Sequence, residues 1–375
     1  MSRKEYAIYV ITKHGLKIAE RIKSVLGDAD LYVSKRFIDQ APEGSFELSL
    51  PMGRTLKKTF KEFDCHIHII SVCAFVRLIA PLMENKKVDP AIVCVDDAAK
   101  FSICVLSGHV GRGNFYTAQV ADILDSTPVI TTASDVGGTL TVDILGRDLG
   151  WALEDMDRNV TRGCAAVVNE EKVLFVQESG EPNWWPIHQK LPKGVEYKTS
   201  LENVNPQDYE ILLIASERNN IKTTHKDIWE NAIIYHPKNI VLGIGCDKDT
   251  PYDVVKKGVF HFLEQKNISP KSVKALATID VKKDEPALLK LKEEFGWKLI
   301  TYPANQLDNV AGIENPSDVV KKYVGTKSVG EAACLLAADA KKLLMPKQKF
   351  NLETGGKNMT LAMAKIEHLP RPGVQ

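Results

Sequence analysis

The sequence lacks the marks of membrane, secreted and nucleic-acid-binding proteins. No apolar run reaches about 18 residues, the length of a membrane-spanning helix, and the first apolar segment breaks at Lys13, too early for a secretory signal. Lys and Arg number 49 against 48 Asp and Glu, so no basic excess favours binding to nucleic acid or an anionic membrane. The seven cysteines include no C-x-x-C pair, which argues against a disulfide framework and a structural zinc site. We therefore expect a cytoplasmic protein.

The sequence has instead the alternation of a globular α/β protein. With 44% hydrophobic and 26% charged residues over 375 positions, it has room for two or three domains. Apolar runs alternate with amphipathic segments in its first and last parts, a pattern typical of mostly parallel sheets covered by helices. The sequence between these two parts is rich in turn residues, and the apolar run at 164–169 within it predicts a strand. We predict mostly parallel-sheet N-terminal (1–150) and C-terminal (238–375) α/β domains and a small mixed α/β middle domain (151–237).

The most informative local feature is a glycine-rich turn, SGHVGRGN, at residues 107–114. It lies between a predicted strand at 101–106 and a predicted helix at 115–124. Its three glycines leave backbone N–H groups accessible, and the helix N-terminus adds positive charge, so the turn suits an anion. The G-x-x-G-x-G spacing differs from the dinucleotide fingerprint, and no Lys-Ser/Thr follows as in a P-loop. His109 is either a general acid or base, because histidine titrates near neutrality, or a solvent-facing loop residue.

Other polar residues have both a functional and a structural explanation. Asp135 follows a predicted strand, where ligands of open α/β sheets gather, but a turn aspartate would fit as well. Ser328 and Glu331 fit the S-x-x-E capping box, so Glu331 either caps a helix or forms part of an active-site wall. His66 and His68 share one strand face and are best explained by a polar sheet edge, because no third ligand lies at a suitable spacing. We expect no metal site.

A second glycine turn, GIGCDKDTP, occupies residues 243–251. Thr250 as N-cap and Pro251 as the first helical residue predict a helix over 251–265, and this explanation needs no ligand. Two aspartates flank Lys248, which is the only cation expected at this turn. From the residues alone, the turn is either a capped strand-to-helix connection or an anion site.

Several stretches of the sequence occur in a fixed order: VRLIAP (76–81), DPAIV (89–93), LSGHVGRGN (106–114), TTASD (131–135), GIGC (243–246), YPA (302–304), SVGEAA (328–333) and TLA (360–362). Together they resemble the cobalt-precorrin-5A hydrolase family, CbiG of anaerobic cobalamin synthesis, over nearly the whole chain. Three positions differ from the family motifs. Arg112-Gly113 stands where the family has Gly-Ala, and Ser134 stands where it has threonine. Residues 247–249 stand where the family has two basic residues and a glycine.

The resemblance implies a substrate and a reaction. The substrate is a cobalt-bearing tetrapyrrole with acetate and propionate carboxylates, a δ-lactone and a methylated meso carbon. Water opens the lactone and a two-carbon fragment leaves as acetaldehyde, giving cobalt-precorrin-5B. The resemblance implies no cofactor, because the substrate carries the cobalt. It implies catalytic roles for His109, Asp135 and Glu331, with His109 or Asp135 as the base. The implied substrate-binding residues are Arg77, Ser107, Gly108, Gly111, Arg112, Gly113, Asn114, Thr132, Gly243, Gly245, Cys246, Lys248 and Thr250.

The implied partner is the cobalt-corrinoid substrate, without nucleic acid or membrane. A homodimer and transient contacts with neighbouring pathway enzymes stay open. Two other functions also stay open. A non-catalytic corrinoid-binding or handover protein could share this sequence pattern, because no G-x-S-x-G or other evident nucleophile motif is present. A nucleotide-binding α/β protein is disfavoured by the missing fingerprint.

Overall fold

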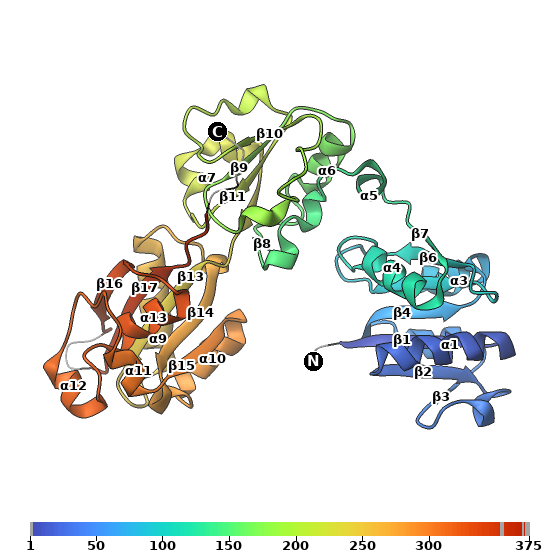
Figure 1. Cartoon of the computed structure of the whole chain (residues 1–375), viewed down its shortest axis with the longest axis horizontal. Coiled ribbons are helices and arrows are strands. Elements are labelled where there is room, and N and C mark those ends of the chain that lie inside the picture. Colours follow the sequence, from blue (N-terminus) through green and yellow to red (C-terminus); the bar gives the residue numbers. More distant parts are fainter. Residues whose placement is uncertain (1–2, 353–355, 370, 372–375) are drawn as a thin grey trace. The chain divides into compact units, whose positions relative to one another are not determined.

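The computed structural model describes residues 3–352, 356–369 and 371 and contains three β-sheets (Figure 1). The chain divides into two compact units, residues 1–144 and 145–375. The first unit holds one sheet, and the second holds the middle and the C-terminal sheets. The predicted α/β class is confirmed. Within the described residues, no helix is both long and apolar enough to cross a bilayer.

The first unit is built on a seven-stranded sheet of order β3-β2-β1-β4-β5-β6-β7. Its strands are β1 (Lys4–Val10), β2 (Ala29–Ser34), β3 (Phe46–Leu48), β4 (Phe63–Ile69), β5 (Ala91–Val95), β6 (Phe101–Leu106) and β7 (Thr127–Val129). Strands β1 to β5 are parallel, as the buried apolar runs predict. Strand β6 runs antiparallel to β5, and β7 is parallel to β6. The carboxyl ends of β6 and β7 therefore share the sheet edge at which β5 begins.

Helices cover both faces of this sheet. Helices α1 (Lys13–Leu26) and α4 (Gly113–Leu124) pack on one face, with Leu16 and Val120 in the same core as Ile8. Helices α2 (Gly53–Thr59) and α3 (Val72–Ile79) cover the other face, with Phe75 against Tyr9 and its neighbours. The remaining short helices are η1 (Ile38–Gln40), η2 (Ala80–Leu82), α5 (Ala133–Gly137) and η3 (Val142–Ile144).

The middle sheet has the order β10-β9-β11-β12-β8 and is parallel except for β8. Its strands are β8 (Ala152–Leu153), β9 (Val173–Gln177), β10 (Val195–Lys198), β11 (Ile211–Ala215) and β12 (Ala232–His236). Its helices are η4 (Arg147–Leu149), α6 (Val160–Val168), η5 (Pro182–Trp184), η6 (Pro206–Asp208), α7 (Ile221–Thr224) and α8 (Lys226–Glu230). The strand predicted over 164–169 is wrong: this run belongs to α6. Its buried residues Val160, Gly163 and Val167 follow the helical period, which a short apolar run does not reveal.

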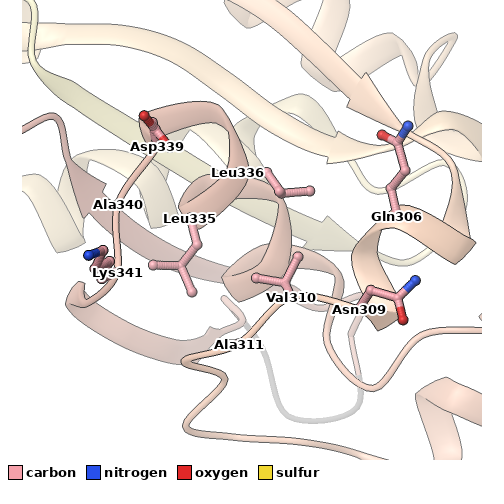
Figure 2. A pocket seen from close by; sticks show the side chains of 9 residues that line it. All are labelled: Gln306, Asn309, Val310, Ala311, Leu335, Leu336, Asp339, Ala340 and Lys341. Atoms are coloured by element: carbon pink, nitrogen blue, oxygen red, sulfur yellow. The ribbon is translucent and has the colours of Figure 1, made fainter.

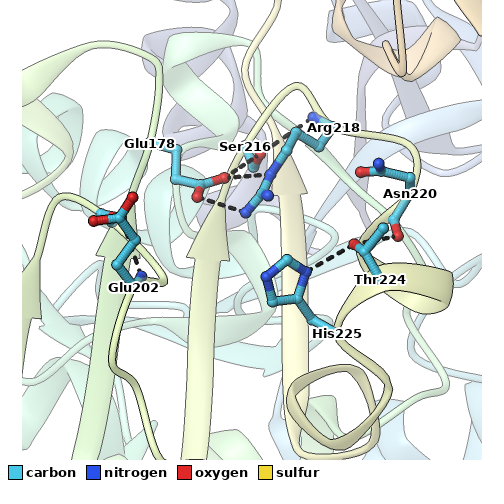
Figure 3. A network of polar contacts seen from close by, with 8 residues as sticks. Glu178, Glu202, Ser216, Arg218, Asn220, Thr224 and His225 are labelled. Carbon is cyan, nitrogen blue, oxygen red and sulfur yellow. Dashed lines mark hydrogen bonds and ion pairs between the residues drawn. The ribbon is translucent and has the colours of Figure 1, made fainter.

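A network of charged and polar side chains lies just after the carboxyl ends of β9 and β11 (Figure 3). The guanidinium of Arg218 donates two hydrogen bonds to Glu178, at 2.6 and 2.9 Å, and Ser216 Oγ donates to the same carboxylate at 2.7 Å. The two hydrogen bonds from Arg218, which follows β11, to Glu178, which follows β9, therefore link the ends of these two strands.

The C-terminal sheet has the order β15-β14-β13-β17-β16. Its strands are β13 (Ile240–Cys246), β14 (Val273–Ile279), β15 (Lys298–Tyr302), β16 (Leu343–Phe350) and β17 (Met359–Lys365), the last two forming an antiparallel pair beside β13. Helices α9 (Tyr252–Gln265) and α10 (Pro286–Phe295) pack on one face, and α13 (Val329–Ala338) packs on the other. Shorter helices are η7 (Pro270–Ser272), η8 (Asp280–Lys282), α11 (Ala304–Asp308) and α12 (Asp318–Val324). An ion pair of Lys365 with Glu217 at 2.6 Å joins this sheet to the middle one.

Candidate functional site

His109 lies in the turn after β6, where three polar side chains converge on its ring. Nε2 lies 2.8 Å from Asp135 Oδ2 and 3.0 Å from Ser134 Oγ. On the other side of the ring, Nδ1 lies 3.2 Å from Asp143 Oδ1, within ion-pair distance. The His109 side chain is 13% exposed, against 40% for Asp135 and 9% for Asp143. The imidazole is thus held between an open and a buried carboxylate.

The carboxylate of Asp135 is itself held by groups from the same turn. Asn114 Nδ2 donates to Asp135 Oδ2 at 2.7 Å and to Thr132 Oγ1 at 2.9 Å. Asn114 belongs to the first turn of α4, and Thr132 is the residue before α5. Because β6 and β7 are parallel, the segments after them meet at one sheet edge. The structure therefore brings His109, Asn114, Thr132 and Asp135 together.

The glycines of this turn are required by close packing. A Cβ at Gly111 would lie 2.5 Å from Ser107 Cβ, and one at Gly113 would lie 2.7 Å from the carbonyl oxygen of Leu106. A Cβ at Gly108 would meet Asn114 Oδ1 at 2.8 Å. The backbone N–H of Gly113, which we expected to face the ligand, donates instead to the Ser107 carbonyl at 2.9 Å. That expectation is wrong for Gly113, because the turn satisfies this donor internally.

Ser107 fixes the start of the turn. Its backbone is left-handed, with φ of 55°, and its hydroxyl donates to the Asp89 carbonyl at 2.9 Å. Arg112 is also left-handed, with φ of 64°. These two residues carry the conformations usually given to glycine, whereas the glycines provide space.

The two candidate arginines make no ion pair with any described carboxylate. Arg112 places its guanidinium 4.4 Å from the ring centre of Phe115, which is half exposed. Arg77 donates to the carbonyl of Cys73, one turn back in α3, at 3.1 Å. Both guanidinium groups keep donors for a carboxylate ligand.

Asp143 and Ser134 are the residues of this cluster that sequence reasoning missed. Asp143 lies in η3, a single short turn with no motif around it. Ser134 was noted only as a departure from the family text. The sequence places both residues within eight positions of Asp135, and this is the one feature that could have indicated them. The fold of residues 133–144 then brings both side chains into contact with the His109 ring.

The two carboxylates change the titration of His109. The interaction with Asp143 is the largest cause that raises the pKa of His109 above its ordinary value, and the bond to Asp135 adds to it. Partial burial acts in the opposite direction, because it disfavours the charged ring. The site therefore favours the imidazolium form.

The last residues of the second glycine turn connect β13 to helix α9. Helix α9 begins at Tyr252 with Pro251 as N-cap, so the expected Thr250 cap is wrong. Pro251 has ψ of 138°, outside the helical region. Thr250 Oγ1 donates to the carbonyl of Asp247 at 2.8 Å and closes the turn. The expectation that Lys248 is the only cation here is also wrong: Lys357 Nζ donates to the Lys248 carbonyl.

The strand end before this turn borders a cavity of about 280 Å³. Gly245, Cys246 and Thr360 form one wall, and apolar side chains of η8 and α12 form the other. Burial raises the pKa of the Cys246 thiol to about 11, so the thiol stays protonated. Gly243, in contrast, serves packing, because a Cβ there would lie 1.8 Å from the carbonyl oxygen of Gly330. Gly243, Lys248 and Thr250 do not line this cavity.

A larger, open cavity of about 800 Å³ lies at the C-terminal end of α13 (Figure 2). Its apolar lining is formed by Val310, Leu335 and Leu336, and Gln306 and Asn309 are polar lining residues on the α11 side. Its lining contains none of the candidate residues, so it gives no support to a catalytic role.

Glu331 is a buried structural clamp. Its carboxylate accepts hydrogen bonds from the backbone N–H groups of Glu314, Asn315 and Lys347, at 3.1, 3.0 and 2.8 Å. Asn315 Nδ2 adds a fourth at 3.1 Å, and Glu331 has no exposed surface. Burial acts to raise the pKa of this carboxyl, but the hydrogen bonds led by those of Asn315 and Lys347 outweigh it and lower the pKa. Of the two alternatives for Glu331, the capping box is wrong, because its carboxylate binds these groups instead of the Ser328 N–H.

His66 and His68 do not lie at a polar sheet edge, so that expectation is wrong too. Both are fully buried and stack with Tyr9, whose ring centre lies 4.3 Å from that of His68. Burial lowers the pKa of His66 to about 4, which keeps its ring neutral. Among the described residues, no three His, Cys, Asp or Glu side chains gather as metal ligands.

Comparison with known proteins decides the family. Residues 54–135 match the model described as cobalamin synthesis G N-terminal, 140–237 match cobalamin biosynthesis central region, and 240–364 match cobalamin synthesis G C-terminus. The chain is 37% identical over 368 residues to a cobalt-precorrin-5A hydrolase of Priestia megaterium, which covers 98% of this chain and 96% of the relative. The chain belongs to the cobalamin synthesis G family.

The comparisons also found two more distant similarities. A cobalt-precorrin-5A hydrolase of Salmonella typhimurium is 29% identical over 338 residues, 88% of this chain and 91% of the relative. A crystal structure of a cobalamin biosynthesis protein G homologue from Sulfolobus solfataricus covers 97% of both chains, with 21% identity and a TM-score of 0.37. The His109 cluster draws on two of the matched segments, with Asp135 in the first and Asp143 in the second.

Proposed function

We propose that this protein is a cobalt-precorrin-5A hydrolase and that the Asp135-His109-Asp143 cluster is its reaction centre. Family membership supports the activity, since full-length relatives carry this name. The observation that carries the site is the meeting of an exposed carboxylate with an imidazole at the carboxyl ends of β6 and β7. Such a pair can move protons to and from water and an ester at neutral pH.

The reaction consumes one water. Its oxygen adds to the carbonyl carbon of the δ-lactone, and the bond between that carbon and the ring oxygen breaks. The ring oxygen stays on the meso carbon as an alcohol, and the former carbonyl group becomes a carboxylate with release of a proton. The alcohol carbon, with its methyl group, then leaves as acetaldehyde. Its O–H proton is lost, and the electron pair of the broken carbon–carbon bond passes into the macrocycle, which takes up a proton.

The surroundings of the cluster suit a carboxylate-rich substrate. Arg112, held over Phe115 without an ion pair to any described carboxylate, supplies a forked donor for a peripheral carboxylate. Cobalt enters as part of the substrate, and we propose no cofactor. The seven cysteines, all free thiols, fit a reducing cytoplasm.

The activity is tested by incubating the protein with cobalt-precorrin-5A without oxygen and assaying acetaldehyde together with cobalt-precorrin-5B. Equal amounts of both products, released over many turnovers, would support the proposal. Tight binding of the corrinoid without any acetaldehyde would instead identify a binding or handover protein. The His109→Ala variant serves as the control for background hydrolysis.

A further inference from the structure

The two ring nitrogens of His109 both face carboxylate oxygens. Asp135 Oδ2 lies 2.8 Å from Nε2, and Asp143 Oδ1 lies 3.2 Å from Nδ1. A neutral imidazole has one N–H donor and one acceptor nitrogen, whereas an ionised carboxylate only accepts. Two carboxylates on opposite sides of the ring are therefore both satisfied only when both nitrogens carry protons.

Two charged groups of the described residues face the ring, Asp135 on α5 and Asp143 on η3. Ser134 adds a neutral hydroxyl, and the Asn114 amide acts through Asp135. The raised pKa of His109 agrees with this arrangement. Asp143 is nearly buried and Asp135 is open, so the two carboxylates differ in their access to substrate and water.

We propose that His109 acts as an imidazolium acid in lactone opening and that Asp143 is the positioning residue that orients and charges it. This rests on the hydrolase function proposed above. Asp135 takes the proton from the attacking water as the oxygen–carbon bond forms. Nε2 of His109 gives its proton to the alcohol oxygen as the lactone carbon–oxygen bond breaks. The proton on Asp135, 2.8 Å away, then returns to Nε2 and restores both groups.

A serine nucleophile is the competing arrangement, because Ser134 Oγ, His109 and Asp143 lie in the order of a catalytic triad. That mechanism needs Nε2 unprotonated, so that it can accept the serine proton. Asp135 Oδ2 lies 2.8 Å from Nε2 and Ser134 Oγ lies 3.0 Å from it, and an ionised carboxylate, which only accepts hydrogen bonds, favours a proton on that nitrogen. The geometry therefore favours the acid.

The first test needs no substrate. The chain has nine histidines, and comparison with His109→Ala identifies the His109 ring signals in an NMR pH titration of labelled protein. We expect Asp143→Asn to lower the pKa of His109, and Asp148→Asn, at a neighbouring aspartate with an 85% exposed side chain, to leave it in place. Titration of His109 at the same pH in wild type and Asp143→Asn would overturn the proposal, whether or not the protein is a hydrolase.

The second test uses turnover. In wild type, kcat should fall as pH rises through the His109 titration, and in Asp143→Asn this fall should move to lower pH. Restoration of the wild-type profile by Asp143→Glu would support a positioning role. A mass-spectrometric adduct of the opened lactone on Ser134, formed at the rate of turnover, would overturn the acid mechanism in favour of a serine nucleophile. Absence of acetaldehyde from the wild type would refute the hydrolase function alone, because the titration still reports on the ring.

Discussion

Replacement of Glu331 by alanine should destabilise the second unit without removing a reacting group. Three backbone N–H groups and one side-chain amide converge on this carboxylate, which has no exposed surface. An unsatisfied buried donor costs about 1 kcal/mol or more, so three backbone donors give a loss of about 3 kcal/mol. Domains are stable by only about 5 to 15 kcal/mol, so this loss is large.

Urea unfolding followed by circular dichroism measures this loss. Glu314→Ala is the matched control, because it removes an exposed side chain and keeps the backbone N–H that Glu331 binds; it should change stability by less than about 0.5 kcal/mol. The folded Glu331→Ala protein should still release acetaldehyde at a rate close to wild type. An unchanged free energy of unfolding together with lost turnover would refute the structural role and return Glu331 to the reaction.

Three further outcomes follow from the described contacts. Gly243→Ala should destabilise the protein by about 1 to 3 kcal/mol in urea, because its Cβ would meet the Gly330 carbonyl at 1.8 Å, whereas Gly137→Ala, with open space around it, should not. Cys246, with its pKa raised to about 11, should react with iodoacetamide at pH 8 far more slowly than the exposed Cys73, as peptide mass spectrometry would show; equal rates would contradict its burial. Because the pKa of His109 is raised in the folded state, its ion pairs stabilise the first unit below the ordinary histidine pKa, and this is lost as pH rises through the raised value. The urea midpoints of wild type and Asp143→Asn should therefore differ at pH 6 and converge at high pH; a constant difference would contradict the linkage.

Local patterns in the sequence were enough to predict the sheets. The strand predicted at 101–106 is β6, and the helix predicted at 115–124 lies within α4. The helix α6 was misread, because a run of small apolar residues has the same composition in a helix and in a strand. Long-range partners were out of reach: the capping-box spacing suggested a local role for Glu331, but its carboxylate binds two distant segments.

The same limit applied to the candidate site. The sequence motifs at 106–114 and 131–135 indicated His109, Asn114 and Asp135, and the parallel pairing of β6 with β7 brings these three residues together. Asp143 had no motif, because its position depends on how the chain turns after α5. Its contact with Nδ1 appears only in three dimensions.

The central claim is that His109 carries the proton transfer of lactone opening. Its most direct test is a single-turnover measurement of acetaldehyde release from cobalt-precorrin-5A, without oxygen, by wild type and His109→Gln, with the dissociation constant of the corrinoid measured in parallel. Loss of general acid or base catalysis costs about 100 to 10,000-fold, so His109→Gln should slow release by that factor while binding the corrinoid nearly as tightly as wild type. Release by His109→Gln within a few-fold of wild type would contradict the account.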